Sequence, residues 1–294
     1  MAKQTLTKAD IPRLASYSLA PDDHPDVDCA QMEHRINLLQ QWSIPSSSRV
    51  LEFGCGQGLC TTVLAANAQL AGSDEKPGHI DAVDPAPLTY GTPTTLGEAQ
   101  GFIMNSEVGG CISWHQADPE EFLKGSEETW DVAVLAHCIW YFDSPGRVKR
   151  LFTALKGRVK RVCIAEYALS ASEPGGVPHV LAALGRGFME AHRTSSENIR
   201  TLLSPREIKN SMEGAGWKVE KETVIVPGEE LQDGRWEVGS FTAEGTIKEI
   251  EALDVDEGVK IMLLSARDAV IASVKGLAGG KVRTMNTYVA VFEC

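Results

Sequence analysis

A glycine-rich loop that follows a short apolar run carries the residue types with the clearest chemical meaning. The segment VLEFGCGQG places Glu52 before a loop whose glycines are Gly54, Gly56 and Gly58. Glycines allow positive φ and let a ligand lie directly against the backbone. A loop that binds a dinucleotide pyrophosphate has the order G-x-G-x-x-G, whereas the third glycine position here holds Leu59 and an acid precedes the loop. The segment therefore favours a ligand that carries a positive charge.

Histidines and aromatic residues form the second group of candidates. His137 ends the apolar run WDVAVLAH, and ligands of open α/β sheets bind at the carboxyl ends of the strands. It is therefore a candidate general base, with a structural histidine as the alternative. Trp140 and Tyr141 follow and offer an aromatic wall for a flat or cationic ligand, unless they pack in the core. His179 is a further candidate for substrate binding, with a solvated loop histidine as the alternative.

The elements that must position these residues alternate between strand-like and helix-like segments from residue 49 onward. This alternation is typical of a parallel sheet with helical crossovers, so we predict an α/β fold. The expected strands are residues 50–53, 79–83, 111–115, 131–136, 161–166, 217–226 and 287–292, and the expected helices between them are residues 61–67, 96–105, 119–124, 147–155 and 205–215.

The N-terminal part, residues 1–45, precedes that alternation. Prolines and acids in residues 1–27 predict an irregular arm. Asp28 is the expected N-cap of a helix that ends before Ile44.

Two long segments, residues 168–203 and 227–281, interrupt the alternation. They contain helix-like patterns around residues 180–189 and 259–277. Both insertions are candidate covers over a site; packing for stability or for dimerisation is the alternative, so a homodimer stays open. The strand-like runs account for nearly the whole chain, which we interpret as a single domain, residues 1–294.

The composition describes an acidic chain with enough apolar residues for a full core. The 294 residues are 43% hydrophobic and carry a formal net charge of -12, which argues against nucleic acid as a partner because phosphate backbones are bound by Lys and Arg. The longest nearly apolar stretch, residues 132–142, is too short to cross a bilayer, and residues 1–10 lack the apolar core of a secretion signal. We therefore expect a cytoplasmic protein without a membrane partner. Seven cysteines without a C-x-x-C pair fit neither a disulfide framework nor a zinc site, and no metal is expected.

The glycine loop and the strand ends together resemble the class I S-adenosylmethionine-dependent methyltransferases. The resemblance covers residues 49–168, with a weaker match as far as Cys294, and rests on E-x-G-x-G-x-G as motif I. It implies a Rossmann-like, doubly wound seven-stranded sheet with helical insertions, and S-adenosylmethionine as the cofactor. Residues 227–281 are longer than the connection that usually joins the last two strands of that family.

The resemblance also assigns roles to individual residues. Asp84 matches the acid that binds the ribose hydroxyls at the end of the second strand, and one carboxylate can accept hydrogen bonds from both hydroxyls. Asp118 matches the acid that binds the adenine amino group after the third strand. The alternatives are a turn-starting aspartate, a helix cap and, for Glu52, a merely structural acid. The implied cofactor contacts are Tyr17 from the arm, Glu52, Gly54, Cys55, Gly56, Gly58, Asp84, Pro85, Ala117, Asp118 and Ala136, and the candidate substrate contacts are Trp140, Tyr141 and His179.

Together, the motifs, the composition and the resemblance predict an enzyme that transfers a methyl group to an oxygen or nitrogen atom of a small-molecule acceptor. A methyl group on a sulfonium is already activated, so the enzyme has to position the acceptor and exclude water, and needs a base such as His137 only if the acceptor must lose a proton. The small-molecule acceptor is favoured by the acidic charge and the cover-like insertions, although protein substrates stay open. The alternatives are a catalytically silent cofactor-binding partner of a larger complex and a nicotinamide-dependent oxidoreductase, which Glu52 and Leu59 disfavour.

Overall fold

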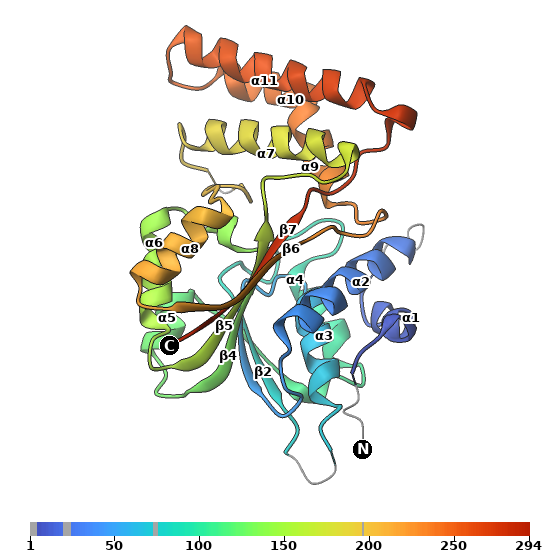
Figure 1. Cartoon of the computed structure of the whole chain (residues 1–294), viewed down its shortest axis with the longest axis vertical. Helices are drawn as coiled ribbons and strands as arrows, with labels where there is room; N and C mark the ends of the chain where they lie inside the picture. Colours follow the sequence, from blue (N-terminus) through green and yellow to red (C-terminus); the bar gives the residue numbers. More distant parts are fainter. Residues whose placement is uncertain (1–4, 20–24, 73–75, 196) are drawn as a thin grey trace.

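A mixed sheet forms the centre of the molecule (Figure 1). The computed structural model describes residues 5–19, 25–72, 76–195 and 197–294. Within these residues the sheet has seven strands in the order β3-β2-β1-β4-β5-β7-β6. The first five in this order are parallel, and β7 lies antiparallel between β5 and β6. The strands are β1 (Arg49–Phe53), β2 (His79–Asp84), β3 (Ile112–Gln116), β4 (Trp130–Ala136), β5 (Val159–Tyr167), β6 (Lys218–Ile225) and β7 (Thr287–Glu293).

The predicted seven-stranded α/β sheet is therefore confirmed, and each strand begins and ends within two residues of its predicted bounds. The helices of the described residues are α1 (Ile11–Ala15), α2 (Pro25–Trp42), α3 (Leu59–Ala68), α4 (Leu96–Met104), α5 (Pro119–Lys124), α6 (Pro145–Ala154), α7 (Val177–Glu190), α8 (Pro205–Gly214), α9 (Asp233–Thr242), α10 (Glu244–Glu251) and α11 (Glu257–Lys275). Short 3-10 turns lie at Lys8–Asp10, Gly109–Cys111, Ile139–Tyr141, Pro174–Gly176 and Ala278–Gly280.

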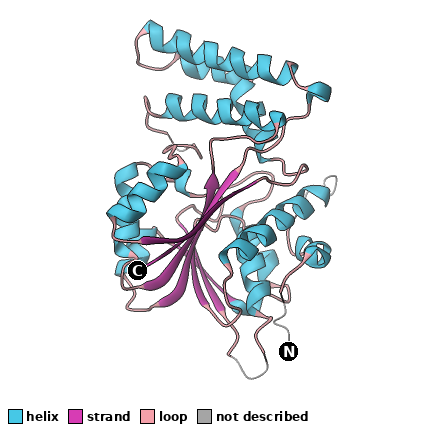
Figure 2. Cartoon of the chain, in the orientation of Figure 1, coloured by secondary structure: helices cyan, strands magenta, loops and turns pink. Residues whose placement is uncertain are grey.

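The two faces of the sheet bury separate hydrophobic clusters, because successive side chains of a strand point to opposite faces. In β1, Val50 packs with α2 and α3, whereas Leu51 and Phe53 pack with α5, α6 and α8. Figure 2 shows these two groups of helices on opposite sides of the strands. Helices on both faces explain why the central strands read as nearly continuous apolar runs.

The helices of the two insertions pack against one another at one end of the sheet. Figure 1 shows α7, α9, α10 and α11 stacked beyond the carboxyl end of β5. Ala182 of α7 shares a buried cluster with Phe241 of α9 and Val270 of α11, and Met189 of α7 shares another with Ile250 of α10. The insertions thus form one helical layer. Among the helices that the structure describes, none is long and apolar enough to span a membrane.

The N-terminal part differs from its prediction. The arm contains a 3-10 turn and helix α1, and α2 begins at Pro25, so Asp28 lies inside the first turn and is not the N-cap. Proline is favoured in the first turn, since its missing N–H has no partner there and its φ is already helical. A carboxylate in this turn still interacts favourably with the helix dipole.

The order of the strands creates a crevice above β1. The chain runs outward from β1 through β2 to β3 and then returns to β4 on the other side of β1. Phe53 pairs with Val83 of β2 and with Leu135 of β4, so the residues that follow these three strands meet at one edge. Open α/β sheets bind ligands at such a switch point.

Candidate active site

The glycine loop is tied to the end of β2 through the carboxylate of Asp84. Its Oδ2 accepts a hydrogen bond from the Gly56 amide at 2.8 Å, and its Oδ1 accepts one from the Ala86 amide at 2.9 Å. The Gly54 amide donates to the carbonyl of Val83 at 2.9 Å. Each Asp84 oxygen keeps further accepting capacity, because a carboxylate oxygen has two lone pairs.

All three glycines of the loop have left-handed backbone conformations, and Gly54 and Gly56 differ in their surroundings. Gly54 has φ 69°, and a Cβ there would lie 2.4 Å from Cβ of Cys138, so packing against the turn that follows β4 requires glycine. Gly56 has φ 52°, and nothing lies within 4 Å of its Cβ position. The loop therefore presents bare backbone beside open space, as the sequence predicts.

A cavity of about 440 Å³ lies over the loop, a size typical of small-molecule sites. It is bounded by the loop, the end of β2, the start of α5 and the turn after β4. The predicted site residues that line it are Gly54, Gly56, Asp84, Pro85, Asp118 and Tyr141, together with Cys138, Phe142 and Arg147.

Asp118 caps a helix while it lines this cavity. Its Oδ1 accepts hydrogen bonds from the amides of Glu120 and Glu121 at 2.9 and 3.2 Å, and its Oδ2 pairs with the guanidinium of Arg147. Asp118 is therefore the N-cap of α5, as the alternative interpretation predicts. Its carboxylate still lies at the cavity wall, so helix capping and ligand binding are compatible.

Glu52 is buried between β1 and α3. Its Oε2 accepts a hydrogen bond from Thr61 Oγ1 at 2.6 Å, and only 1% of the residue is exposed. Burial raises the pKa of this carboxyl to about 7, against the opposing effect of the Thr61 hydrogen bond. Glu52 thus supports the loop from within the core.

Other predicted cofactor residues also lie in the frame of the site. Cys55 is buried, and Gly58 begins α3 in a left-handed conformation. The Ala117 amide donates to the carbonyl of Asp84 at 3.1 Å, and Ala136 ends β4. These residues shape the edge of the sheet around the cavity.

The side chains of Tyr17 and Trp140 pack in the core, and each makes a hydrogen bond within the protein. The Tyr17 hydroxyl donates to Glu107 at 2.7 Å, and its ring packs with α2 and α3. The Trp140 indole N–H donates to the carbonyl of Leu203 at 2.9 Å, and 2% of the residue is exposed. This geometry gives no support to Tyr17 as a cofactor cover or to Trp140 as an acceptor wall. Each ring is used to attach a loop to the body of the protein.

His137 stands at the end of β4 in a strained conformation. Its φ of 54° is unusual for a residue other than glycine, and its amide donates to Ala165 at 2.8 Å. Its Nε2 lies 2.9 Å from Nε2 of His34, and its Nδ1 lies 3.6 Å from Oε1 of Glu166. Such strain is commonly found at functional sites.

A polar cluster surrounds His137, and the sequence did not reveal most of it. The Tyr167 ring lies 4.4 Å from the His137 ring, centroid to centroid, and the Tyr167 hydroxyl donates to Asp233 at 2.8 Å. The Gln31 amide donates to the other Asp233 oxygen at 2.9 Å. His179 is fully buried and accepts a hydrogen bond at Nδ1 from the Met285 amide at 3.1 Å. We define the polar cluster as Gln31, His34, His137, Glu166, Tyr167, His179 and Asp233.

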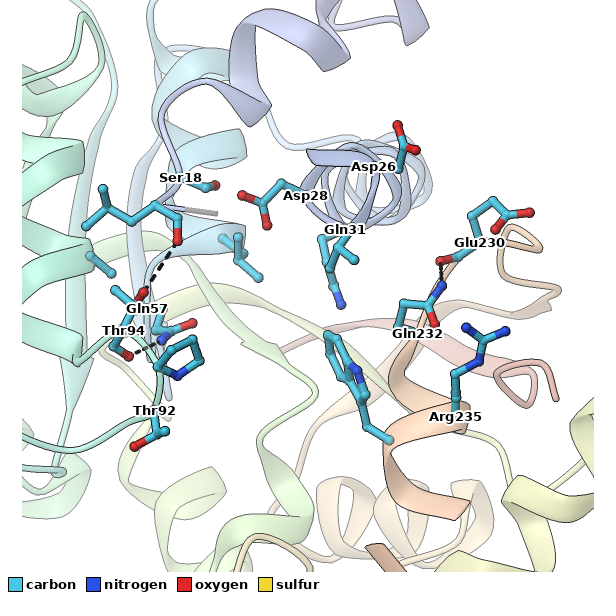
Figure 3. Close-up of a pocket in the computed structure, with 16 residues that line it drawn as sticks. Ser18, Asp26, Asp28, Gln31, Gln57, Thr92, Thr94, Glu230, Gln232 and Arg235 are labelled. Atoms are coloured by element: carbon cyan, nitrogen blue, oxygen red, sulfur yellow. Dashed lines mark hydrogen bonds between the residues drawn. The ribbon is translucent and has the colours of Figure 1, made fainter. Parts of the chain in front are cut away.

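A second cavity, of about 860 Å³, opens beside this cluster between α2 and α9. Figure 3 shows Asp28 and Gln31 of α2 on one side of it and Gln232 and Arg235 on the other. Within the described part of the chain, Asp28 Oδ2 is buried without a hydrogen-bond partner. Burial raises the pKa of that carboxyl. Gln31 therefore belongs both to the polar cluster and to the wall of this cavity.

Comparison with known proteins identifies the family. Residues 27–222 match the model of a methyltransferase domain family. The chain belongs to this methyltransferase family. Together with the glycine loop and the seven-stranded fold, this makes it a class I methyltransferase whose methyl donor is S-adenosylmethionine.

Relatives and solved structures agree with that assignment. The methyltransferase is similar to "Methyltransferase phomM" of Diaporthe leptostromiformis, with 30% identity over 280 aligned positions that cover 80% of this chain and 72% of the relative. Its fold is similar to that of a cyclopropane-fatty-acyl-phospholipid synthase-like protein from Lactobacillus casei, with a TM-score of 0.84, 22% identity and coverage of 98% and 100% of the two chains. A mycolic acid cyclopropane synthase, complexed with SAH and CTAB, has a TM-score of 0.52 and 13% identity, with 99% of each chain covered.

Proposed function

We propose that the 440 Å³ cavity binds S-adenosylmethionine, which supplies an electrophilic methyl group. Asp84 would accept hydrogen bonds from the ribose hydroxyls, because both of its oxygens keep free lone pairs at the cavity wall. Asp118, which also lines this cavity, would bind the adenine amino group. The main support for this proposal is the hydrogen bond from the Gly56 amide to Asp84 Oδ2, beside glycine backbone that is open to the cavity.

The acceptor is proposed to be a small molecule bound in the 860 Å³ cavity. Three carboxylates, Asp26, Asp28 and Glu230, line this cavity against one guanidinium, Arg235. Such a wall is rich in hydrogen-bond acceptors, so it favours a ligand that presents O–H or N–H donors. This supports oxygen or nitrogen over sulfur or carbon as the methylated atom. The net charge of -12 further disfavours nucleic acid.

The polar cluster, whose residue Gln31 lines the 860 Å³ cavity, is the proposed place of proton acceptance. His137 is the base that the sequence predicts, and its position directly after β4 supports a place near the reacting atoms. Tyr141 lines the cofactor cavity and is 45% exposed, so it is the better candidate of the two predicted aromatic contacts. His179 is buried against Tyr167, with ring centroids 5.1 Å apart, and would shape the cluster.

A turnover screen tests the enzymatic function. The protein is incubated with S-adenosylmethionine and a panel of amines, phenols and thiols, and release of S-adenosylhomocysteine is followed. Turnover of an amine or phenol, reduced at least tenfold by Asp84→Ala at limiting cofactor, is the expected result. Tight cofactor binding without turnover of any panel member would favour the alternative of a silent cofactor-binding partner. Asp254→Ala, at an exposed position between α10 and α11 that lines neither cavity, is the matched control.

A further inference from the structure

Two buried imidazoles are in contact through their ring nitrogens. His34 of α2 and His137 after β4 face each other through their Nε2 atoms at 2.9 Å. A hydrogen bond at this distance needs a proton on one Nε2 and a lone pair on the other. When both rings are neutral, each carries a single N–H. The ring that donates through Nε2 therefore has a bare Nδ1, and the ring that accepts carries its proton on Nδ1.

The carboxylate of Glu166 determines which of the two imidazoles accepts this hydrogen bond. Its Oε2 accepts hydrogen bonds from the amides of Ile139 and Trp140 at 3.0 and 3.3 Å, and its Oε1 accepts one from its neighbour Tyr167 at 3.0 Å. These amides fix the carboxylate with Oε1 at 3.6 Å from His137 Nδ1. A lone pair on this nitrogen would be repelled by the carboxylate, whereas an N–H is attracted to it. The proton of neutral His137 thus resides on Nδ1.

This tautomer leaves His137 without a basic nitrogen. Its Nδ1 carries the proton that faces Glu166, and its Nε2 accepts from His34. The Nδ1 atoms of both rings are buried without a hydrogen-bond partner among the described residues, and the carboxylate of Glu166 distinguishes them. With the proton on Nδ1 of His137, the free lone pair is on Nδ1 of His34. We propose that His34 Nδ1 is the nitrogen that accepts the acceptor's proton, and that His137 and Glu166 are positioning residues that orient it. This inference rests on the proposed function.

The surroundings of His34 fit this role. Gln31, three residues earlier on the same face of α2, lines the 860 Å³ cavity, whereas His34 is 2% exposed and lies outside the cavity lining, so the proposed proton path passes Gln31. Burial, with His137 and Arg35 nearby, lowers the pKa of His34 well below its usual value, which keeps its lone pair free. The other charged or titratable groups of the surroundings are Glu166 and Tyr167 of β5, His179 of α7 and Asp233 of α9.

The proposed step balances as a simple proton transfer. The O–H or N–H bond of the acceptor breaks, its electron pair stays on the acceptor atom, and a new N–H bond forms on His34 Nδ1. The positive charge that appears on the imidazole pair faces the carboxylate of Glu166, which stabilises it through His137.

The tautomers are tested first, by a measurement that needs no acceptor. Long-range ¹H–¹⁵N spectra of protein labelled in its seven histidines distinguish protonated from bare ring nitrogens, and His34→Gln and His137→Gln assign the signals. The expected result is Nε2–H with bare Nδ1 for His34, and Nδ1–H with bare Nε2 for His137. A proton on Nε2 of His137 would overturn the inference. Glu166→Gln, which replaces the carboxylate by an amide, should weaken the preference.

Kinetics then test the proton transfer, with the acceptor that turns over in the screen. His34→Gln should lower kcat about 10²-fold, the usual scale of general-base catalysis, and should remove the acidic limb of the pH profile. Affinity for S-adenosylhomocysteine should stay within about twofold, and exposed His192→Gln should behave as wild type. Unchanged kcat in His34→Gln would refute the role of His34. Failure of the wild type to bind S-adenosylhomocysteine would instead refute the proposed function, while leaving the tautomer result intact.

Discussion

Replacing Glu52 by glutamine should change how the stability of this methyltransferase depends on pH. Burial between β1 and α3 raises the pKa of Glu52 from 4.5 to about 7. In the unfolded chain the carboxyl is in water and loses its proton near its ordinary pKa. Between these pH values the folded protein keeps a proton that the unfolded chain has lost. The stability gained from this group is therefore complete at low pH and is lost as the pH rises through about 7.

The size of the effect follows from the two pKa values. A rise from 4.5 to about 7 corresponds to about 3 kcal/mol, at 1.36 kcal/mol for each pKa unit. About 2 kcal/mol of this loss falls above pH 5.5, since the carboxyl of the unfolded chain is already mostly ionised there. Glutamine has nearly the same shape, can still accept the Thr61 hydrogen bond and has no titration.

Urea unfolding between about pH 5.5 and 8.5, followed by tryptophan fluorescence, measures this difference. The wild type should lose about 2 kcal/mol more of its free energy of unfolding across this range than Glu52→Gln does. Glu127→Gln, at an exposed position, is the control and should follow the wild type. Parallel curves for the wild type and Glu52→Gln would refute the reasoning, because they would mean that Glu52 titrates alike in the folded and unfolded chains.

Three further changes test other parts of the structure. Gly54→Ala should destabilise the fold by about 2–4 kcal/mol in urea unfolding, from its left-handed φ and the contact with Cys138, whereas Gly101→Ala, in an open position of α4, should stabilise it by about 0.5–1 kcal/mol. Asp84→Ala should weaken S-adenosylhomocysteine binding at least tenfold in calorimetry with little change in melting temperature; unchanged affinity would remove the ribose role. Tyr167→Phe should cost about 1–3 kcal/mol of stability, because Asp233 then loses a buried donor, and wild-type stability would contradict that contact.

The fold and the cofactor edge could be predicted from the sequence because their signals are local. The run VLEF and its glycine loop carry both the strand and the ligand chemistry within nine residues. Asp84 ends β2 and Asp118 closely follows β3, so a parallel sheet brings them to the same edge. The bounds of the central strands β1, β4 and β5 were recovered for the same reason, since these runs are largely apolar and bounded by turn residues.

The polar cluster could not be predicted because its members converge only through packing. His34 comes from α2, His137 from the end of β4 and Asp233 from α9, and no spacing in the sequence relates them. The helical insertion that carries Asp233 gives a clear periodic signal in α11, yet nothing in that signal indicates that α9 returns to the sheet. The sequence also could not show which aromatic residues contact a ligand and which pack in the core. Trp140 packs in the core, whereas its neighbour Tyr141 lines the cavity.

Titration calorimetry with S-adenosylhomocysteine, with NADH as the comparison ligand, tests the central claim most directly. We expect saturable one-to-one binding of S-adenosylhomocysteine, weakened at least tenfold by Asp84→Ala, and no measurable binding of NADH. Tight NADH binding, with S-adenosylhomocysteine unbound, would contradict the reading of the glycine loop and of the acids around it.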